Sequence, residues 1–241
     1  MNELSVIIPC ISTTELLPAL VDELAGYLMA NPSDVDIIVV ANEKSYTPNN
    51  LSGYVQSNYP WLKFEMLQLK GGRRSFGALA RFGIAYSTSS YVVLVSGYGE
   101  DDIGIIPKML NQIRNGAQVV QATRSGSLSN KNDVSFKFRL YQALYRFLIK
   151  LLLGIKIKDS TYGFKMFDRV FIQSLGLNQN GFSICPEITL KALLAGGRVE
   201  YVDSKVKSKP LNKDFKLYKE GISYLWLLLR GFAHRLGILW F

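Results

Sequence analysis

Short apolar runs alternate with longer amphipathic segments in the first half of this chain. Most of the apolar runs are β-branched and show no apolar–polar alternation, which is typical of strands covered on both faces. They predict five strands, at residues 6–8, 37–40, 64–69, 91–95 and 117–122. The sheet that these strands form is therefore expected to lie between layers of helix.

Helical patterns separate the strands at residues 14–29, 75–86 and 105–114, where apolar residues recur at helical spacing. This alternation predicts an α/β domain of right-handed βαβ units, with a mostly parallel sheet flanked by helices. In such sheets, ligands bind beyond the carboxyl ends of the strands. The segments at those ends are 10–14, 41–46 and 96–102.

The second half of the chain is predicted to be mainly helical, at 136–153, at 186–194 and from Phe215 onward. Neither an internal repeat nor a low-complexity linker interrupts it. We therefore divide the chain into one domain at 1–213 and a C-terminal amphipathic helix at 214–241.

The C-terminal segment is apolar but contains basic residues. Residues 222–241 are long enough to cross a bilayer, but Arg230, His234 and Arg235 interrupt the apolar run. Tryptophans and basic residues around a broad apolar face favour a helix that lies in the headgroup layer of a membrane. The alternative is a helix that closes the domain core or forms an interface in a homo-oligomer or with a partner subunit.

The composition restricts the class of protein and its partners. Hydrophobic residues make up 48% of the 241 residues and charged residues 20%, which excludes a disordered chain and a polytopic membrane protein. The formal net charge of +9 implies an anionic partner: nucleic acid, acidic lipid headgroups or a phosphorylated substrate. The basic residues are interleaved with Leu and Phe on helices, so a nucleic-acid partner is not expected. With two cysteines and one histidine, neither a disulfide framework nor a Cys/His zinc site is expected.

The most specific segment is Asp159-Ser160-Thr161-Tyr162-Gly163-Phe164-Lys165-Met166-Phe167. It resembles the Asp-(Ser/Thr)-Thr-X-Gly-Phe-(Lys/Arg)-X-Phe motif of the dolichyl- or polyprenyl-phosphate sugar synthases, which are family-2 glycosyltransferases. Further matches follow the order of that family: Val6 to Pro9 with Leu17-Pro18, Gly83 with Ala85, Tyr91 to Leu94 with Ile106 to Lys108, Thr123-Arg124, and Glu187. The resemblance implies the GT-A fold. It also implies transfer of a sugar from a nucleotide-sugar donor to a polyprenyl phosphate or a related membrane-associated acceptor, as in cell-envelope polysaccharide synthesis.

All three donor-side motifs of the family are altered in this chain, whereas the acceptor-side motifs persist. The opening Pro-X-Tyr-Asn-Glu reads Pro9-Cys10-Ile11-Ser12-Thr13, the Asp-Asp-Gly-Ser turn reads Ala41-Asn42-Glu43-Lys44, and the metal-holding Asp-X-Asp reads Ser96-Gly97-Tyr98. The matched positions still imply donor-binding roles for Pro9, Asn42, Glu43, Ser96 and Tyr98.

The family holds a divalent cation, Mg²⁺ or Mn²⁺, against the donor diphosphate, and carboxylates normally supply its ligands. Glu100 falls where the family has an auxiliary metal-binding residue, so Glu100 and Asp102 are candidate ligands of a displaced metal site on the donor side. The alternative is that this acidic turn caps the helix that follows it. Arg73 and Arg74 could instead meet the diphosphate without a metal, or they could form a solvated basic turn.

On the acceptor side, the resemblance implies that Arg124 and Arg139 bind the lipid phosphate, together with Ser160 and Lys165 of the motif. Arg139, Arg146 and Lys150 fall on one stripe of the otherwise apolar helix at 136–153. A narrow basic stripe on a wide apolar body fits an interfacial helix beside anionic headgroups. It fits equally a core helix with three solvated charges.

Two carboxylates are candidate catalytic residues. Asp159 either orients a loop or acts as the base, and the orienting role is favoured because a phosphate oxygen hardly needs a base at neutral pH. Glu187 either contacts the acceptor or an arginine of the site, or it is an acid in the first turn of a helix.

These observations predict a glycosyltransferase with an atypical metal site, peripheral at the cytoplasmic face of a membrane. The alternative is a non-catalytic protein of the same fold that lost donor binding and serves as a partner or regulator. Binding of a nucleotide sugar separates the two hypotheses.

Overall fold

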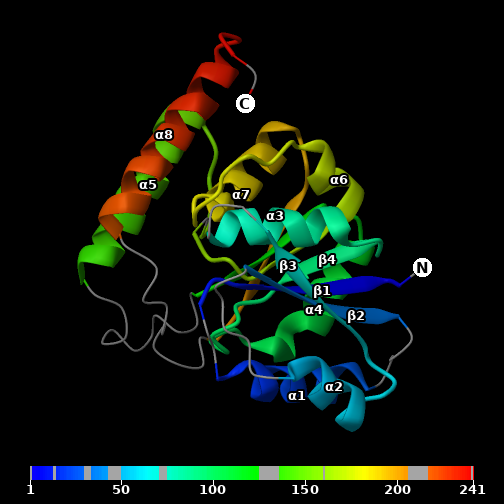
Figure 1. Ribbon diagram of the computed structural model, residues 1–241. Coiled ribbons are helices and arrows are strands. Elements are labelled where there is room, and N and C mark those ends of the chain that lie inside the picture. Colours follow the sequence, from blue (N-terminus) through cyan, green and yellow to red (C-terminus); the bar gives the residue numbers. More distant parts are fainter. Residues whose placement is uncertain are drawn as a thin grey trace.

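A sheet of seven strands forms the centre of the part of the chain that the structure describes (Figure 1). The computed structural model describes residues 2–12, 15–29, 34–42, 50–70, 75–124, 136–159, 161–205, 217–239 and 241, with only the backbone at 136–139 and 217–219. The strands are β1 (Leu4–Cys10), β2 (Val35–Asn42), β3 (Lys63–Leu69), β4 (Tyr91–Leu94), β5 (Val119–Thr123), β6 (Lys165–Asp168) and β7 (Val199–Asp203). Their order across the sheet is β3-β2-β1-β4-β6-β5-β7.

The sheet is mostly parallel, which confirms the prediction from the sequence. The exception among the described strands is β6, which pairs antiparallel with β4 on one side and with β5 on the other. Because two antiparallel steps restore the direction, β5 runs parallel to β1, β2 and β4. The carboxyl ends of these four strands therefore lie along one edge of the sheet.

Helices cover both faces of the sheet (Figure 1). One layer contains α1 (Leu17–Leu28), α2 (Leu51–Asn58), the short helix η1 (Ile103–Ile105) and α4 (Ile106–Arg114). The other contains α3 (Phe76–Tyr86), α6 (Arg169–Ser174) and α7 (Ile184–Leu194). Side chains alternate along each strand, so Val6 and Ile8 of β1 pack toward α1 while Ile7 packs toward α3. Both faces are covered, as the apolar runs predict.

Two long helices, α5 (Phe136–Leu153) and α8 (Leu217–Arg235), lie side by side at one edge of the molecule (Figure 1). A third apolar cluster joins them to α7; its buried members are Tyr145, Ile149, Leu153, Leu190, Tyr224, Leu227 and Leu228. The opposite face of α8 is exposed, with Trp226 62% exposed. One face of α8 thus closes the core, and the other is an open apolar surface.

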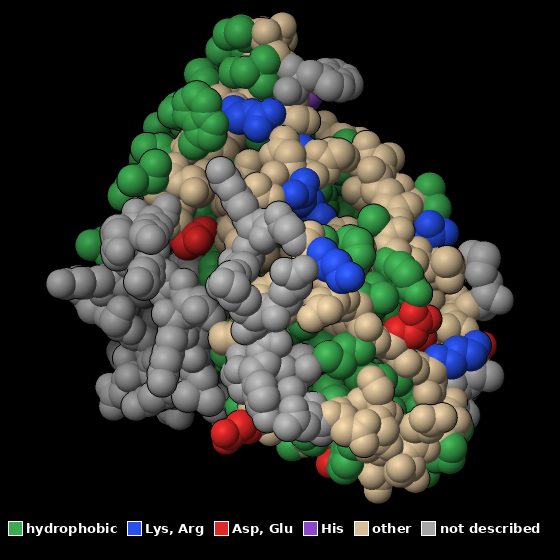
Figure 2. All heavy atoms as spheres, viewed as in Figure 1, with side chains coloured by type: hydrophobic (Ala, Val, Ile, Leu, Met, Phe, Trp, Pro, Cys, Tyr) green, Lys and Arg blue, Asp and Glu red, His purple; other side chains and the backbone are tan. Residues whose placement is uncertain are grey.

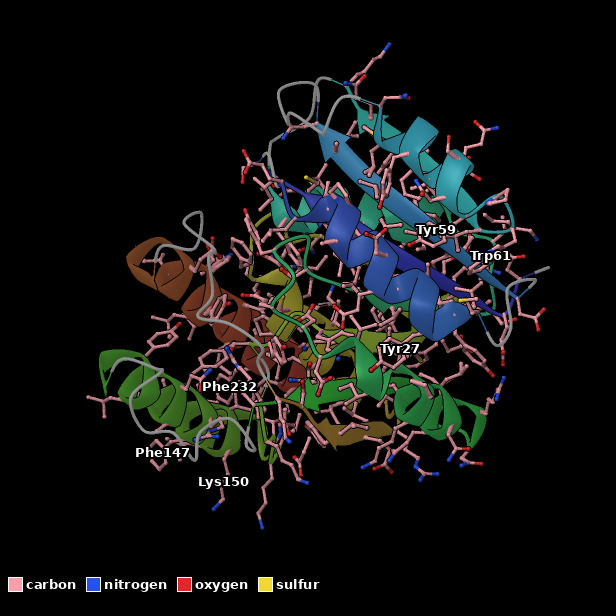
Figure 3. All side chains as sticks on the ribbon, turned by 90° about the horizontal axis from the view of Figure 1, so that it is seen from below. Tyr27, Tyr59, Trp61, Phe147, Lys150 and Phe232 are labelled. Carbon is pink, nitrogen blue, oxygen red and sulfur yellow. The ribbon has the colours of Figure 1, made fainter. Side chains whose placement is uncertain are left out.

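The outer side of this helix pair is visible from below the molecule (Figure 3). Phe232 of α8 points toward α5, where it packs against the cluster that joins the two helices. Phe147 and Lys150 of α5 point away from the body of the protein, and both are exposed. The helix pair therefore has an inner apolar face and a separate outer face that carries apolar and basic side chains.

Candidate active site

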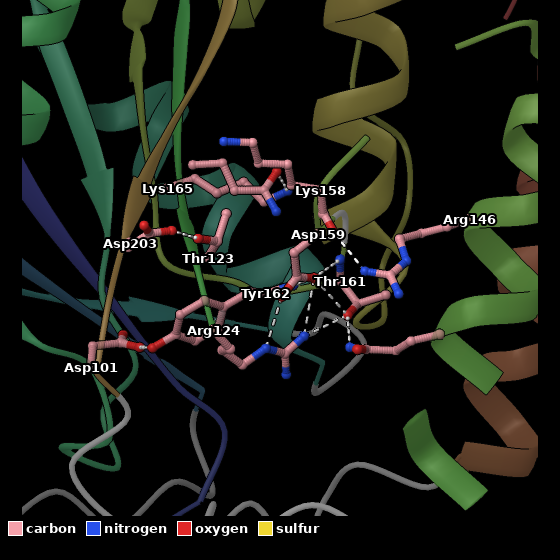
Figure 4. Close-up of polar contacts among 12 residues, drawn as sticks. Asp101, Thr123, Arg124, Arg146, Lys158, Asp159, Thr161, Tyr162, Lys165 and Asp203 are labelled. Carbon is pink, nitrogen blue, oxygen red and sulfur yellow. Dashed lines mark hydrogen bonds and ion pairs between the residues drawn. The ribbon is translucent and has the colours of Figure 1, made fainter. Parts of the chain in front are cut away.

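The candidate site lies at the edge where β1, β2, β4 and β5 end. Arg124 follows β5 directly, and the motif loop that begins at Asp159 leads into β6. Arg124 and Asp159 form a two-pronged ion pair, in which Nε donates to Oδ2 at 2.9 Å and Nη2 to Oδ1 at 3.1 Å (Figure 4). This geometry is the strong form of an arginine–carboxylate contact.

Asp159 also organises its own loop. Its Oδ1 accepts hydrogen bonds from the backbone nitrogens of Thr161 at 3.0 Å and Tyr162 at 3.3 Å. Burial acts to raise the pKa of Asp159, but the charge and hydrogen bonds of Arg124 outweigh it and hold that pKa below its ordinary value. Burial likewise acts against the charge of Arg124, and Asp159 keeps its pKa raised. The carboxylate is therefore ionised and fully engaged, as the orienting role requires.

A second set of contacts lies behind the arginine. The Cζ atom of Arg124 is 4.9 Å from the centre of the Tyr162 ring, within the range of a cation–π contact. Tyr162 Oη donates to Asp101 Oδ1 at 2.7 Å, and the Ser96 nitrogen donates to Asp101 Oδ2 at 2.7 Å. Burial, together with the charge of Glu100, raises the pKa of Asp101 to about 7. The turn after β4 is thus connected to the acceptor-side motif.

The helix α5 contacts the same loop from its other side. Gln142 Nε2 donates to Thr161 Oγ1 at 2.9 Å, and Arg146 Nη1 donates to the Lys158 carbonyl at 2.9 Å. Gln142 belongs to no motif, although it lies three residues after Arg139 on the same stripe of the helix. The Arg139 side chain lies outside the described residues, so its predicted phosphate contact stays a prediction.

Two residues predicted for the site are fully buried beneath it. Lys165 Nζ donates to the Cys185 carbonyl at 2.6 Å, to Thr189 Oγ1 at 2.5 Å and to Gln121 Oε1 at 3.1 Å. Burial lowers the pKa of Lys165 to about 8. These contacts tie β6 to α7 and β5, because the strand alternation directs this side chain into the α7 layer. The structure thus places the Lys165 ammonium in the core rather than at the surface where a phosphate would bind.

Glu187, in the first turn of α7, is also completely buried. Its carboxylate oxygens accept hydrogen bonds from the nitrogens of Asn178 and Gln179, both at 2.9 Å, and Lys191 Nζ lies 3.0 Å away. The structure therefore does not bring Glu187 to Arg124, and its position fits the alternative of a first-turn acid that also fixes the preceding loop.

Apart from the acidic turn at 100–102, the donor-side residues that the structure describes are uncharged and mostly polar. Ser12 Oγ and Tyr98 Oη are 2.9 Å apart, which joins the end of β1 to the turn after β4. The Tyr98 nitrogen donates to Ser96 Oγ at 3.3 Å, and Asn42 Nδ2 donates to the Ile11 carbonyl at 3.4 Å. Pro9 lies within β1 opposite β2. Four predicted residues lie outside the described part of the chain: Glu43, Arg73, Arg74 and Ser160.

The family model of glycosyl transferase family 2 matches residues 5–176, most of the chain. The chain belongs to glycosyl transferase family 2. This membership identifies a transferase, which favours the enzyme over the non-catalytic alternative. None of the curated protein sequences matches the chain.

Solved structures of other proteins have a similar fold. One is glucosyl-3-phosphoglycerate synthase from Mycobacterium tuberculosis, in complex with Mn²⁺, UDP-glucose and phosphoglyceric acid. Its TM-score is 0.68 at 15% identity over 96% of this chain and 80% of that chain. Another is mannosyl-3-phosphoglycerate synthase from Rubrobacter xylanophilus, with a TM-score of 0.62 at 15% identity over 98% of this chain and 74% of that chain. These similarities show that the chain has the GT-A fold.

The carboxylates of the described residues do not gather into a site for the divalent cation that this family implies. Asp101 accepts hydrogen bonds with both of its oxygens, and Asp102 Oδ2 accepts the Lys205 nitrogen at 3.4 Å. Asp102 stands at the N-cap of η1 without a side-chain capping bond. Glu100 Oε2 is buried without a hydrogen-bond partner among the described residues, and burial raises the Glu100 pKa. Within those residues, no three acidic, His or Cys side chains gather as a metal site.

Proposed function

We propose that this family-2 transferase moves a sugar from a nucleotide-sugar donor to the phosphate of a polyprenyl phosphate, or of a related lipid acceptor, at a membrane surface. Arg124 is the residue that binds the acceptor phosphate. The observation that carries this proposal is the position of Arg124, which is held by Asp159, 20% exposed, and bonded through Thr161 to the apolar helix α5.

The local chemistry supports a phosphate at Arg124. A guanidinium presents several fixed N–H donors that match the oxygens of a phosphate, and its charge does not titrate at neutral pH. The similar glucosyl-3-phosphoglycerate synthase was solved with phosphoglyceric acid, so a protein of this fold binds a phosphorylated ligand. At 15% identity, this similarity supports only a phosphorylated acceptor and not a particular one.

The exposed face of the helix pair supports a lipid rather than a soluble acceptor. Exposed apolar side chains recur on one face of each helix: Leu140, Leu144, Phe147 and Leu151 on α5, and Ile222, Leu225, Trp226 and Leu229 on α8. Figure 2 shows apolar side chains gathered along the edge of the molecule where this helix pair lies, with a Lys or Arg side chain beside them. Apolar faces with basic neighbours bind the headgroup layer of anionic membranes. Among the described helices, none is long and apolar enough to cross a bilayer.

In the proposed reaction, an oxygen of the acceptor phosphate forms a bond to the anomeric carbon of the donor sugar. The bond from that carbon to the phosphate oxygen of the nucleotide breaks, and the nucleotide leaves with the electron pair, as a diphosphate from a UDP- or GDP-sugar and as CMP from a CMP-sugar. Arg124 holds the acceptor phosphate in place, and Asp159 orients Arg124 rather than removing a proton, because the phosphate oxygen is already ionised at neutral pH. We assign the donor diphosphate to the end of β1 and the turn after β4, where the hydroxyls of Ser12 and Tyr98 meet at 2.9 Å.

The test is transfer of radiolabelled sugar from UDP-, GDP- or CMP-linked donors into an organic-extractable product. One arm supplies undecaprenyl phosphate in vesicles, and the other supplies 3-phosphoglycerate in solution. We expect label in the lipid from one donor and its loss in Arg124→Ala. Arg114→Ala is the matched control, because it breaks a similar two-pronged pair with Glu3 on the surface. Label in phosphoglycerate alone, or equal activity of Arg124→Ala and Arg114→Ala, would overturn the proposal.

A further inference from the structure

Three side chains form a continuous path from the donor-side turn to the acceptor-side arginine (Figure 4). Asp101 accepts the Ser96 nitrogen with one oxygen and the Tyr162 hydroxyl with the other. The Tyr162 ring lies under the Arg124 guanidinium, which Asp159 holds from its other side. Asp101 and Tyr162 are 61 residues apart in the chain, so this connection is made only by the fold.

Burial decreases along this path toward the arginine. Asp101 is 1% exposed and Tyr162 is 6% exposed, whereas 20% of the Arg124 side chain is exposed. A ligand therefore reaches the arginine but not the two residues behind it. A buried hydrogen bond between a hydroxyl and a carboxylate restricts the tyrosine ring to one orientation, because an unmade bond would leave buried polar atoms without partners.

We infer that Asp101 and Tyr162 are positioning residues, which fix Arg124 for the acceptor phosphate and connect it to the turn that carries Ser96 and Tyr98. That the ligand of Arg124 is a phosphate rests on the proposed function. That Asp101 and Tyr162 position Arg124 does not. In this chain the acidic turn after β4 therefore also supports the acceptor side of the site. One of its carboxylates points inward to support the acceptor arginine, in a turn where the family places metal ligands.

Tyr162→Phe is the sharpest variant, because it removes the hydroxyl and keeps the ring under Arg124. We expect it to weaken binding of farnesyl phosphate, used as a short-chain probe, by about tenfold, since a small misplacement of a positioning group has effects of this size or larger. Tyr54→Phe is the control, because its hydroxyl donates a bond of 2.8 Å to Asp22 on the surface. It is expected to leave binding unchanged.

A double-mutant cycle separates positioning from general loss of structure. If Tyr162 acts through Arg124, then Tyr162→Phe has no further effect on farnesyl phosphate binding in the Arg124→Ala background. An equal loss in both backgrounds, or binding by the wild type that Tyr162→Phe leaves unchanged, would overturn the inference. Asp101→Ala is expected to weaken binding as Tyr162→Phe does. Asp101→Asn is expected to keep binding near that of the wild type, because an asparagine can still form hydrogen bonds with both Ser96 and Tyr162.

A measurement without ligand keeps the inference independent of the proposed function. The Nε–H signal of Arg124 in a nitrogen–proton NMR spectrum, assigned from its absence in Arg124→Ala, reports how the guanidinium is held. We expect it to shift and to exchange faster with water in Tyr162→Phe and Asp101→Ala, but not in Tyr54→Phe or Asp101→Asn. An unchanged signal would overturn the inference. Changed signals in a protein that does not bind farnesyl phosphate would overturn only the phosphate ligand.

Discussion

Gln142 of α5 donates a hydrogen bond of 2.9 Å to Thr161 Oγ1, the oxygen that also accepts Arg124 Nη2 at 2.7 Å. The helix with the exposed apolar face is thereby joined to the loop that holds the candidate phosphate-binding arginine. A helix that lies on a membrane and touches this loop would bring the arginine to the level of the lipid headgroups. The contact therefore links the proposed membrane surface to the proposed acceptor site.

This contact leads to the first prediction. We expect Gln142→Ala to lower transfer to undecaprenyl phosphate in vesicles about threefold to tenfold, because the loop loses its bond to the helix, while the free energy of unfolding falls by about 1 kcal/mol. Transfer rates and urea unfolding measure the two effects. The control is Gln173→Ala on α6, whose Nε2 donates a bond of the same length to the Ile84 carbonyl. Equal losses of transfer in both variants would contradict the prediction.

The ion pair of Arg124 and Asp159 should contribute more to stability than a surface pair does. Its side chains are 20% and 11% exposed, so removing one charge leaves the other poorly solvated. We expect Asp159→Asn to lower the free energy of unfolding in urea by about 2 kcal/mol, less than for a fully buried pair. Glu3→Gln breaks the exposed pair with Arg114 and should cost less than about 1 kcal/mol. The prediction fails if the two variants unfold at the same urea concentration.

Some of this architecture could be predicted from the sequence, and the reasons are specific. The β-branched runs at 37–40 and 91–95 identify β2 and β4, because such runs are typical of strands covered on both faces. The helix at 136–153 has the predicted bounds of α5, since its apolar residues recur at helical spacing and Gly154 follows with a positive φ of 70°.

The rest depends on pairings that a single sequence does not contain. β6 has only four residues, and no periodicity indicates that it enters the sheet antiparallel between β4 and β5. The motif alone therefore indicates that Lys165 binds phosphate, although the strand directs its side chain into the core. Asp101 looked like one member of an acidic turn, because its partner Tyr162 lies far along the chain.

The outer face of α5 and α8 gives a prediction about membranes. We expect Phe147→Glu and Trp226→Glu each to weaken binding to vesicles that contain anionic lipid at least tenfold. Each variant removes an apolar side chain that would insert into the membrane, and its new carboxylate is repelled by the anionic headgroups. Both residues are exposed, so the folded state should lose little stability. Co-sedimentation with the vesicles measures the effect. Val170→Glu on α6 is the control, since Val170 is 64% exposed on the other helical layer, and an equal loss there would contradict the prediction.

The buried Lys165 should make stability depend on pH in the alkaline range. Burial lowers the pKa of Lys165 from 10.5 to about 8, so between these values the unfolded chain binds more protons than the folded one. The buried ammonium therefore lowers the free energy of unfolding below pH 8, and this loss disappears as the pH rises toward 10.5. Nζ donates to three oxygens as an ammonium, and the neutral amine keeps two N–H donors for them.

Lys165→Met isolates this effect, because the other titrating groups are present in both proteins. We expect the free energy of unfolding of the wild type, minus that of the variant, to increase by about 2 kcal/mol between pH 7.5 and 9.5. Urea unfolding at several pH values measures this difference, and Lys108→Met at an exposed position of α4 provides the comparison. The variant also leaves Cys185, Thr189 and Gln121 without their donor, which lowers its stability at every pH but does not change the slope. A wild-type-minus-variant difference that stays flat across this range would show that the Lys165 ammonium is not held at a lowered pKa in the folded protein.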